Sequence, residues 1–400
     1  MAEPESGPVD PSIAQGAQIP LQTFTLPHFP PEASHLRALT LTSDIKLDEY
    51  TQQLETFSAI PPLPQEIQSL TLELFSLGYP PGFLTALATA LPNIKSFDAY
   101  SQLLCGITPE SQADAVAFFA KCENLRAAHL LDVFARPGFF AEVGEKLAAR
   151  EKGLLFLQFN YTYRHEDEEF LSRIPAGELP LLIGPSLVMC SFNIAAPETT
   201  DDPEDPTNLT CEGADLGGAK PEGVMAFHKS CSDVLVGRLT DGKTKPKALK
   251  VLNTTLYTLV PADLEKILRE QKDLLVLNAT VEVEPTEECK QKLLGALELC
   301  PLLEQVEIVA NPSLAFSMAV MNPRHQALSK AFPSAQDMDR LSKSCERLSK
   351  FSATVLRTTT VGEVKWDREG GVWNGGVSQP EPPSSSTGMP SELQDVSAAA

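Results

Sequence analysis

The sequence predicts an α/β solenoid, a stack of short strand–helix units, and three observations support this. A six-residue frame, apolar-x-x-apolar-x-apolar, recurs along most of the 400 residues at steps near thirty. Between the frames, apolar residues return at helical spacing. Hydrophobic residues make up 42% of the chain and charged residues only 21%, so a continuous core is possible. We therefore expect a curved parallel sheet on the concave side and helices on the convex side, in about ten irregular repeats.

Each frame predicts one short strand whose three apolar side chains face the helices. The frames are Leu36/Leu39/Leu41, Ile67/Leu70/Leu72, Ile94/Phe97/Ala99, Leu125/Ala128/Leu130, Leu154/Leu157/Phe159, Leu187/Cys190/Phe192, Leu249/Leu252/Thr254, Leu274/Leu277/Ala279, Leu303/Val306/Ile308 and, more weakly, Leu348/Phe351/Ala353. No single unit can bury its own apolar face, but its neighbours in a stack can cover it.

One step is about twice the usual length. From Leu187 to Leu249 it spans 62 residues (249 minus 187) and includes an acidic, proline-rich stretch. We expect a degenerate repeat around Val224–Val236 and a flexible acidic loop near 197–222, because insertions in solenoids extend from the stack without breaking it.

Helices are expected between the frames. Pro81-Gly82-Phe83 and Pro137-Gly138-Phe139 each open a run of apolar residues at helical spacing. Pro109 and Pro261 stand where a first helical turn is expected, since the N–H that proline lacks has no partner there.

The two ends of the chain differ from the repeats. Residues 1–20 and 378–400 are rich in Pro, Ser, Glu and Ala without periodicity, which predicts disordered tails around a solenoid over 21–377. Near 363–373 two short segments, each with a tryptophan, flank Asp367–Gly370. They predict a hairpin that covers the open core edge of the last repeat.

Net charge and targeting signals indicate which classes of partner and which cellular location to expect. The formal net charge of −21 argues against nucleic acid or an anionic membrane as a partner, and a basic protein partner fits it. The alternative is that the negative charge only keeps a long repeat protein soluble. No secretory signal and no apolar run of about 18–20 residues is present, so we expect a cytoplasmic or nuclear protein.

The eight cysteines show neither CxxC pairs nor a disulfide framework. Cys122, Cys300 and Cys345 each stand three residues before a frame, which predicts small buried side chains in a reducing compartment. The runs His165–Glu169 and His228–Cys231 lack the convergent ligands that a metal requires. We expect no metal and no cofactor.

The candidate binding surface lies on the concave side. The residue between the last two apolar positions of a frame points there, because side chains alternate across a strand. That row is polar and free of Lys and Arg: Thr40, Thr71, Asp98, His129, Gln158, Ser191, Asn253, Asn278, Glu307 and Ser352. The flanking rows contain apolar and aromatic groups, including Phe156 and Tyr100. A polar ladder beside apolar rows is typical of a protein-binding face, and a solvated face without a ligand is the alternative.

The binding candidates from these rows are Asp98, Tyr100, His129, Phe156, Gln158, Ser191, Asn253 and Asn278.

Asp98 and His129 occupy equivalent positions on adjacent strands, so their Cβ atoms should lie about 5 Å apart. A carboxylate beside an imidazole is a start for acid–base chemistry. No Ser or Cys nucleophile stands in register beside them, since position 127 is Ala and position 158 is Gln. We expect a hydrogen-bonded surface pair and assign no catalytic residue, with an enzyme centred on this pair as an alternative.

Several frame segments, such as Leu91–Phe97, Cys122–Arg126 and Cys300–Ile308, resemble the leucine-rich-repeat family. The similarity is to the irregular intracellular type with units near thirty residues, as in ribonuclease-inhibitor-like and F-box-associated proteins, and it covers about 34–360. The asparagine that this family usually places three residues after the last strand anchor occurs only as Asn311. Irregular curvature is therefore expected.

The resemblance implies a non-catalytic scaffold or adaptor that binds a protein on its concave face. A substrate-recognition subunit of a ubiquitin-ligase assembly is the alternative. Leu63-Pro64-Gln65-Glu66-Ile67 superficially matches the opening of an F-box, but Ile67 already anchors the second frame.

Overall fold

The computed structural model describes residues 16–162, 170–195, 229–312, 327–355 and 363–378. The strands are β1 (Gly16–Leu21), β2 (Ala38–Ser43), β3 (Ser69–Glu73), β4 (Ser96–Leu103), β5 (Ala127–Phe134), β6 (Phe156–Thr162), β7 (Met189–Ala195), β8 (Val251–Leu259), β9 (Val276–Val283), β10 (Gln305–Pro312), β11 (Lys350–Val355), β12 (Glu363–Glu369) and β13 (Val372–Ser378). The α-helices are α1 (Leu47–Gln53), α2 (Phe83–Ala90), α3 (Pro109–Lys121), α4 (Phe139–Ala148), α5 (Phe170–Arg173), α6 (Lys229–Thr240), α7 (Pro261–Glu270), α8 (Glu287–Leu297), α10 (Ala327–Ala331) and α11 (Ala335–Ser344). The 3₁₀ helices of the described residues are η2 (Pro31–His35) and η3 (Leu179–Leu182).

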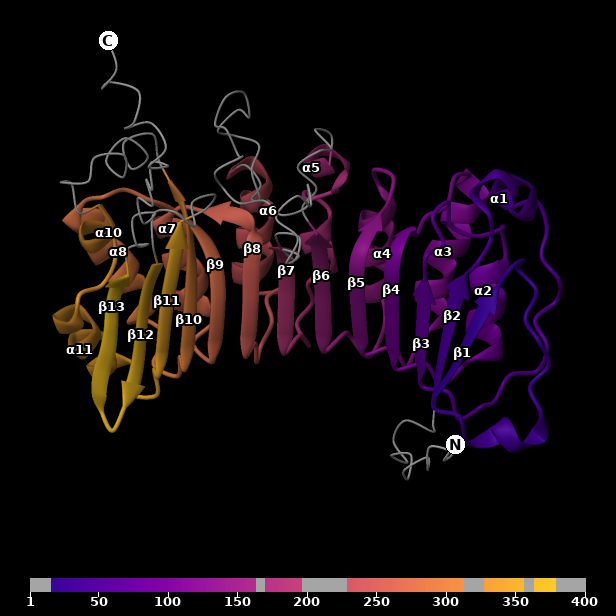
Figure 1. The fold of residues 1–400 in the computed structure, drawn as a ribbon, viewed down its shortest axis with the longest axis horizontal. Helices are drawn as coiled ribbons and strands as arrows, with labels where there is room; N and C mark the ends of the chain where they lie inside the picture. The colour runs from indigo at the N-terminus through magenta and orange to yellow at the C-terminus, as the bar shows by residue number, and fades with distance from the viewer. Residues whose placement is uncertain (1–15, 163–169, 196–228, 313–326, 356–362, 379–400) are drawn as a thin grey trace, which may run out of the picture.

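The strands form one 13-stranded sheet in which spatial order follows chain order, β1 to β13. Figure 1 shows them side by side along the long axis of the molecule. Neighbours are parallel from β1 to β11, and the ten predicted frames are the ten strands β2 to β11, one each. The predicted α/β solenoid is therefore confirmed, as is the order of its repeats.

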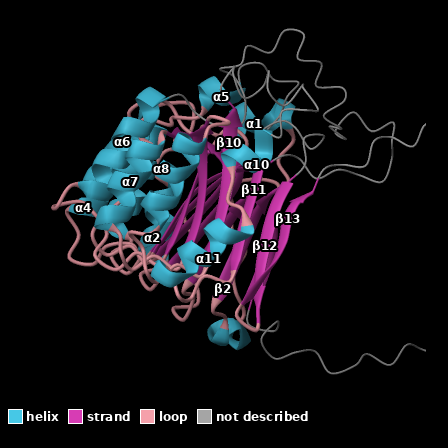
Figure 2. Cartoon of the chain, turned by 90° about the vertical axis from the view of Figure 1, so that its left-hand side faces the viewer, coloured by secondary structure: helices cyan, strands magenta, loops and turns pink. Residues whose placement is uncertain are grey.

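The helices lie on one side of this sheet. In Figure 2, α2, α4, α6, α7 and α8 cover one side, and the other side of the strands is not covered by them. We call this second side the open face; it is the side that the sequence predicted to be concave. The layers arise because each strand directs its frame residues toward the helices, as the complete burial of Leu39, Leu70 and Leu157 shows.

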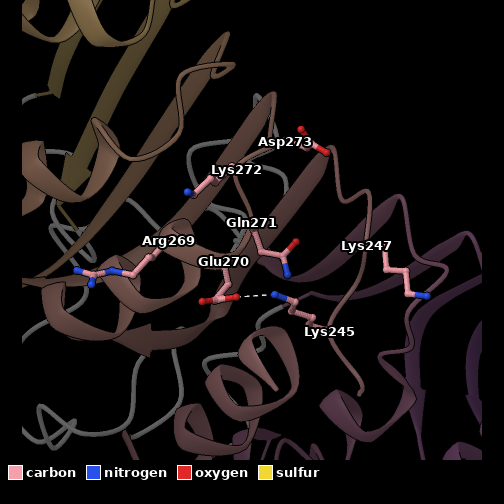
Figure 3. A pocket seen from close by; sticks show the side chains of 7 residues that line it. All are labelled: Lys245, Lys247, Arg269, Glu270, Gln271, Lys272 and Asp273. Carbon is pink, nitrogen blue, oxygen red and sulfur yellow. Dashed lines mark hydrogen bonds and ion pairs between the residues drawn. The ribbon is translucent and has the colours of Figure 1, made fainter. Parts of the chain in front are cut away.

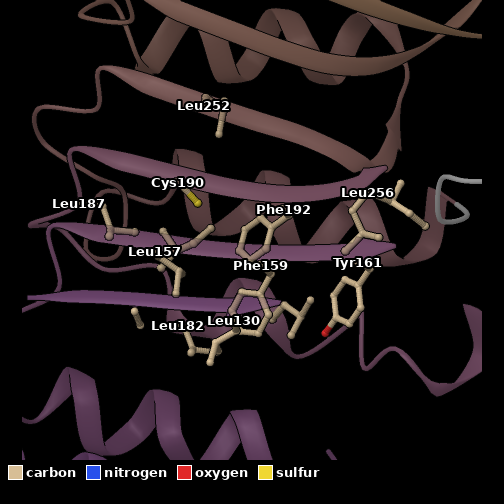
Figure 4. Packing of buried hydrophobic residues seen from close by; sticks show 14 of the residues in the cluster. Leu130, Leu157, Phe159, Tyr161, Leu182, Leu187, Cys190, Phe192, Leu252 and Leu256 are labelled. Atoms are coloured by element: carbon tan, nitrogen blue, oxygen red, sulfur yellow. The ribbon is translucent and has the colours of Figure 1, made fainter. Parts of the chain in front are cut away.

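The core runs without interruption through the stack. The frame residues of successive strands belong to one buried cluster, and Figure 4 shows Leu157, Phe159, Cys190 and Phe192 stacked between neighbouring units. Ring pairs such as Phe159–Phe192, with centroids 5.9 Å apart, join consecutive strands. Each unit buries its apolar groups against the next, as a repeat stack requires.

A backbone irregularity recurs on three adjacent strands. Leu74, Ser101 and Asp132 have φ angles of 61°, 51° and 50°, and each lies three residues after the central polar position of its strand. This bulge-like turn reverses the alternation, so that the next residues, including Gln102 and Val133, are buried. The family's asparagine position is thus occupied here by core residues, because the chain turns inward at that point.

The N-terminal end differs from the expected tail. Residues 16–21 form β1, which pairs in parallel with β2, so the predicted disordered segment 1–20 is wrong for 16–20. This strand contains Gly16 and Pro20, and its register with β2 puts Ala17 and Ile19 opposite the frame residues Leu39 and Leu41. Leu21 is buried at 2% exposure, and this anchors the strand to the first repeat. Residues 1–15 and 379–400 lie outside the described residues.

The long step between frames contains one repeat rather than two. β7 pairs directly with β8, and α6 supplies the helix that joins them, so a degenerate repeat around 224–236 is wrong. The 62-residue step approached two periods only because of an insertion within one unit. The predicted acidic loop near 197–222 lies outside the described residues.

Two antiparallel strands close the C-terminal end, in the region where the sequence predicted a hairpin. β12 pairs with β11 and β13 pairs with β12. Trp366 and Trp373 are 8% and 7% exposed, and the Trp366 indole N–H donates to the Pro333 carbonyl at 3.0 Å. Both rings pack on the last repeat and cover its core edge.

Candidate functional site

The register of the sheet brings the predicted polar row into line. Hydrogen-bonded strand pairs place Asp98 opposite His129, His129 opposite Gln158 and Gln158 opposite Ser191. The same row continues through Asn253 and Asn278. Tyr100 and Phe156 stand in the two flanking rows, because each lies two residues from a member of the central row.

Around His129, several candidate side chains lie close to one another. The His129 Nδ1 lies 3.6 Å from an Asp98 carboxylate oxygen and 3.5 Å from the Tyr100 hydroxyl. Its Nε2 lies 3.2 Å from the side-chain nitrogen of Asn160 on β6. The Tyr100 ring stands edge-on to the imidazole, with centroids 5.5 Å apart. The side chains of His129 and Asp98 are 31% and 20% exposed, so the group is accessible from the open face.

The environment of this group is negative. Partial burial raises the pKa of Tyr100, and the charges of Asp98 and Glu73 raise it further. The phenol therefore remains protonated and acts as a hydrogen-bond donor at neutral pH. Glu73, which accepts a hydrogen bond from the Thr42 hydroxyl at 3.0 Å, was not singled out from the sequence. Its position opposite Tyr100 in the same row was the available signal.

The arrangement does not form a nucleophile–base–acid triad. The Ser96 hydroxyl donates to Asp98 at 3.3 Å, so the carboxylate stands between the serine and the histidine. Serine catalysis needs the imidazole in that middle position, where it can accept the hydroxyl proton. The contacts that the structure shows for His129 are those of a hydrogen-bonded surface group.

Farther along the row, the candidates are polar and neutral. Asn253 accepts hydrogen bonds from the Thr255 N–H at 3.0 Å and from its hydroxyl at 2.8 Å. The same hydroxyl reaches the Asn193 side-chain oxygen at 2.7 Å. Asn253, Asn278 and Gln158 are partly buried.

Ser191 differs from its neighbours in the row, because it is only 3% exposed. Its short side chain lies between the longer side chains of Gln158 and Asn253 on the adjacent strands. Ser191 therefore supports the row without offering surface to a partner.

An apolar row runs beside the polar one. Phe156, Met189, Val251 and Val276 occupy successive rungs from β6 to β9. Phe156 is 45% exposed, which is unusual for an aromatic residue in a sheet that is otherwise well packed. The candidate surface therefore joins an acidic and aromatic part on β3–β5 to an apolar part on β6–β9.

Within the described residues, no three His, Cys, Asp or Glu side chains gather as a metal site would require. His165–Glu169 and His228 lie outside those residues. In the described helices, none has the length and apolarity needed to span a bilayer.

Two cavities in the described part of the chain lie away from Asp98 and His129. One of about 420 Å³ is lined by residues 245–247 and 269–273, and one of about 470 Å³ by residues of the 120–124 and 146–152 segments. Both stand at the edge of the sheet where strands begin, and neither is lined by a residue of the polar row.

Comparisons with known proteins give no close relative. No family model and no curated protein matches the chain. Among solved structures, an internalin from Listeria monocytogenes shares 12% identity with a TM-score of 0.31, over 76% of this chain and 68% of its own. A leucine-rich-repeat protein from Leptospira interrogans shares 12% identity with a TM-score of 0.30, over 84% and 82%. The solenoid architecture rests on the strand order and register of the chain itself.

Proposed function

We propose that this protein is a non-catalytic interaction scaffold that binds a protein partner on the open face, and that the partner is basic. The observation that supports this most strongly is the absence of cations on that face: the strands β1 to β10 contain no Lys or Arg. The same strands carry Glu73, Asp98 and Glu307 in the rows of the open face. A partner with Lys or Arg side chains would find carboxylates there without competition from cations of the sheet.

The apolar row supports a protein as the partner. Phe156 and its neighbours Met189, Val251 and Val276 form the kind of apolar strip that pairs with side chains of another protein. Aromatic anchors near the centre of an interface commonly supply much of the binding energy. We also propose that the repeats are of the ribonuclease-inhibitor-like type and that the protein is cytoplasmic or nuclear. The seven cysteines of the described residues are all unpaired, which supports a reducing compartment.

The test compares charge reversal on the two faces of the sheet. Asp98→Lys changes the open face, and Glu145→Lys makes the same change of charge on exposed α4, on the helix side. We expect the native partner, captured by affinity purification and identified by mass spectrometry, to be lost with Asp98→Lys and retained with Glu145→Lys. Phe156→Ala should weaken capture as well, by about tenfold in affinity. Equal capture by all three variants, each folded by circular dichroism, would remove the open face from consideration.

The ubiquitin-ligase alternative gains no support from the F-box-like segment. Leu63 and Ile67 are 4% and 0% exposed, and both belong to the solenoid core. Their apolar side chains are not available to a cullin adaptor. Co-purification with such an adaptor would restore this alternative, and its loss on truncation of the segment would locate the contact.

A further inference from the structure

The edge of the sheet where β8 and β9 begin has the opposite charge from the open face. The cavity of about 420 Å³ there is lined by Lys245, Lys247, Arg269, Glu270, Gln271, Lys272 and Asp273. Four of these seven side chains are cations and two are carboxylates, in a chain with 32 Lys and Arg against 53 Asp and Glu. The lining residues drawn in Figure 3 come from the loop before β8 and from the end of α7 with the loop that follows it before β9.

The ion pairs of the cavity leave a surplus of positive charge. Lys245 pairs with Glu270 at 2.5 Å, and Arg269 pairs with Glu265 outside the cavity. Within the part of the chain that the structure describes, Lys247 and Lys272 form no ion pair. A hydrogen bond from Lys245 lowers the pKa of Glu270, and the charges of Lys245, Lys272 and Arg269 lower it further. Three cations therefore act together on this small region.

The backbone below these side chains is fixed. Gln271 is 3% exposed, and its side-chain N–H donates to the Leu239 carbonyl at 2.8 Å, which ties the α7–β9 loop to the end of α6. The Lys247 N–H donates to the Pro185 carbonyl at 3.1 Å. The lysine stems thus start from set positions. Figure 3 shows the Lys247 side chain pointing away from Glu270, so its flexible four-carbon stem has to turn inward to contact a ligand.

We propose that this pocket binds a phosphate group, as the dianion of a phosphate monoester or of inorganic phosphate. Lys247 and Lys272 close on its oxygens, and Lys245 is shared between the phosphate and Glu270. A dianion fits better than a single carboxylate, because it satisfies two ammonium groups at once. Long nucleic acids are excluded by the net charge of −21, which repels a polyanion from the rest of the surface. The proposal is independent of binding on the open face.

The second cavity provides a matched control. It has a similar volume, about 470 Å³, and is lined by Lys146, Arg150 and Lys152 together with Glu123 and Glu151. One nitrogen of its arginine is already engaged, because Arg150 Nη2 donates to the carbonyls of Glu123 and Leu125 at 3.0 and 2.7 Å, whereas Nε and Nη1 are buried without a partner. With three cations against two carboxylates, this cavity has a smaller surplus of positive charge at the same kind of location.

The experiment is a calorimetric titration of the full chain at constant ionic strength, with inorganic phosphate in one arm and N-acetyl-phosphoserine amide in the other. We expect saturable binding that Lys247→Gln/Lys272→Gln weakens by about tenfold or more. The control Lys146→Gln/Lys152→Gln should leave the affinity unchanged, and thermal unfolding should show that both double variants are folded. Tighter binding of the phosphoserine derivative would identify a phosphorylated peptide as the source, and tighter binding of inorganic phosphate would identify the free anion.

Two outcomes would overturn the proposal. One is the absence of saturable binding by the unmodified chain up to about 10 mM of either probe. The other is an equal loss of affinity in both double variants, which would indicate a general charge effect rather than a site.

Discussion

Two buried cysteines make the same local contacts in two consecutive units. Cys300 is fully buried, and its thiol lies 3.3 Å from the Leu268 carbonyl and 3.2 Å from the Gln271 carbonyl of the preceding unit. Cys345 repeats this with the carbonyls of Leu297 and Cys300, at 3.5 and 3.3 Å. Gln271, in the equivalent position of the unit before Cys300, uses its amide in the same way. A polar hydrogen at this position satisfies carbonyls at the C-terminal end of the helix of the preceding unit.

These thiols make stability sensitive to alkaline pH. Burial raises the pKa of Cys122 and Cys300 to about 12 and that of Cys345 to about 11. In the unfolded chain a thiol ionises near about 8.5, so the stabilisation is complete below that pH. It is lost as pH rises toward the folded values, because the unfolded state then releases protons first.

We therefore predict that the urea midpoint falls between pH 8 and pH 10 and that Cys300→Ala reduces this fall. The same burial predicts that a thiol reagent modifies Cys122, Cys300 and Cys345 only after unfolding, as peptide mass mapping would show. Rapid modification of these three in the native state would contradict the buried positions.

At the scale of single elements, two helices depend on the following unit for their N-terminal caps. α2 and α4 begin after Gly82 and Gly138, which have φ angles of 88° and 92° and no side chain that could cap the helix. Asp114 of α3 accepts hydrogen bonds from the N–H groups of Leu84 and Thr85 at 2.9 and 3.0 Å. Glu178 does the same for α4, with its closest contact to the Gly138 N–H at 2.6 Å. Each carboxylate thus joins two units and complements a helix dipole.

Removing one of these caps should lower stability without touching the open face. Asp114→Ala leaves the two N–H groups of α2 without an acceptor, and we expect a loss of about 2 kcal/mol in the free energy of unfolding. Asp114→Asn keeps one acceptor oxygen and should lose roughly half as much. Denaturant unfolding of the two variants measures both values. Equal stability of Asp114→Ala and the unmodified protein would show that α2 does not depend on this carboxylate.

The repeat frame predicted the strands and their register because apolar spacing alone determines both. Frame residues such as Leu70 and Phe97 must face the helices, and this fixes which residues stand between them on the open face. The predicted contact of Asp98 with His129 follows from the same register.

Other features had no local signal in the sequence. The caps lie about thirty residues or more from the helices that they serve, and Leu74 and Ser101 are not residue types that favour a positive φ. The burial of Ser191 depends on the lengths of its neighbours on adjacent strands, which only the assembled sheet reveals.

At the scale of the whole molecule, negative and positive charges are concentrated on different surfaces. The open face of β1 to β10 has carboxylates and no cations, whereas the cavity before β8 and β9 collects four cations. These two surfaces would serve ligands of opposite charge, and the continuous sheet holds them at a fixed distance. That arrangement depends on one property of the chain, the unbroken register of the stack across the long step between β7 and β8.

The most direct test of that register is disulfide trapping across this junction. Ser191 and Asn253 are partners in the β7–β8 pair, and Asn253 and Asn278 are partners in the β8–β9 pair, which serves as a control. In-register neighbours in a parallel sheet lie about 4.8 Å apart, within the range that a disulfide spans. We predict that Ser191→Cys/Asn253→Cys and Asn253→Cys/Asn278→Cys both form the bond under mild oxidation. Bond formation by the control pair alone would contradict the account, because it would place another strand, or a break between two bodies, at the junction.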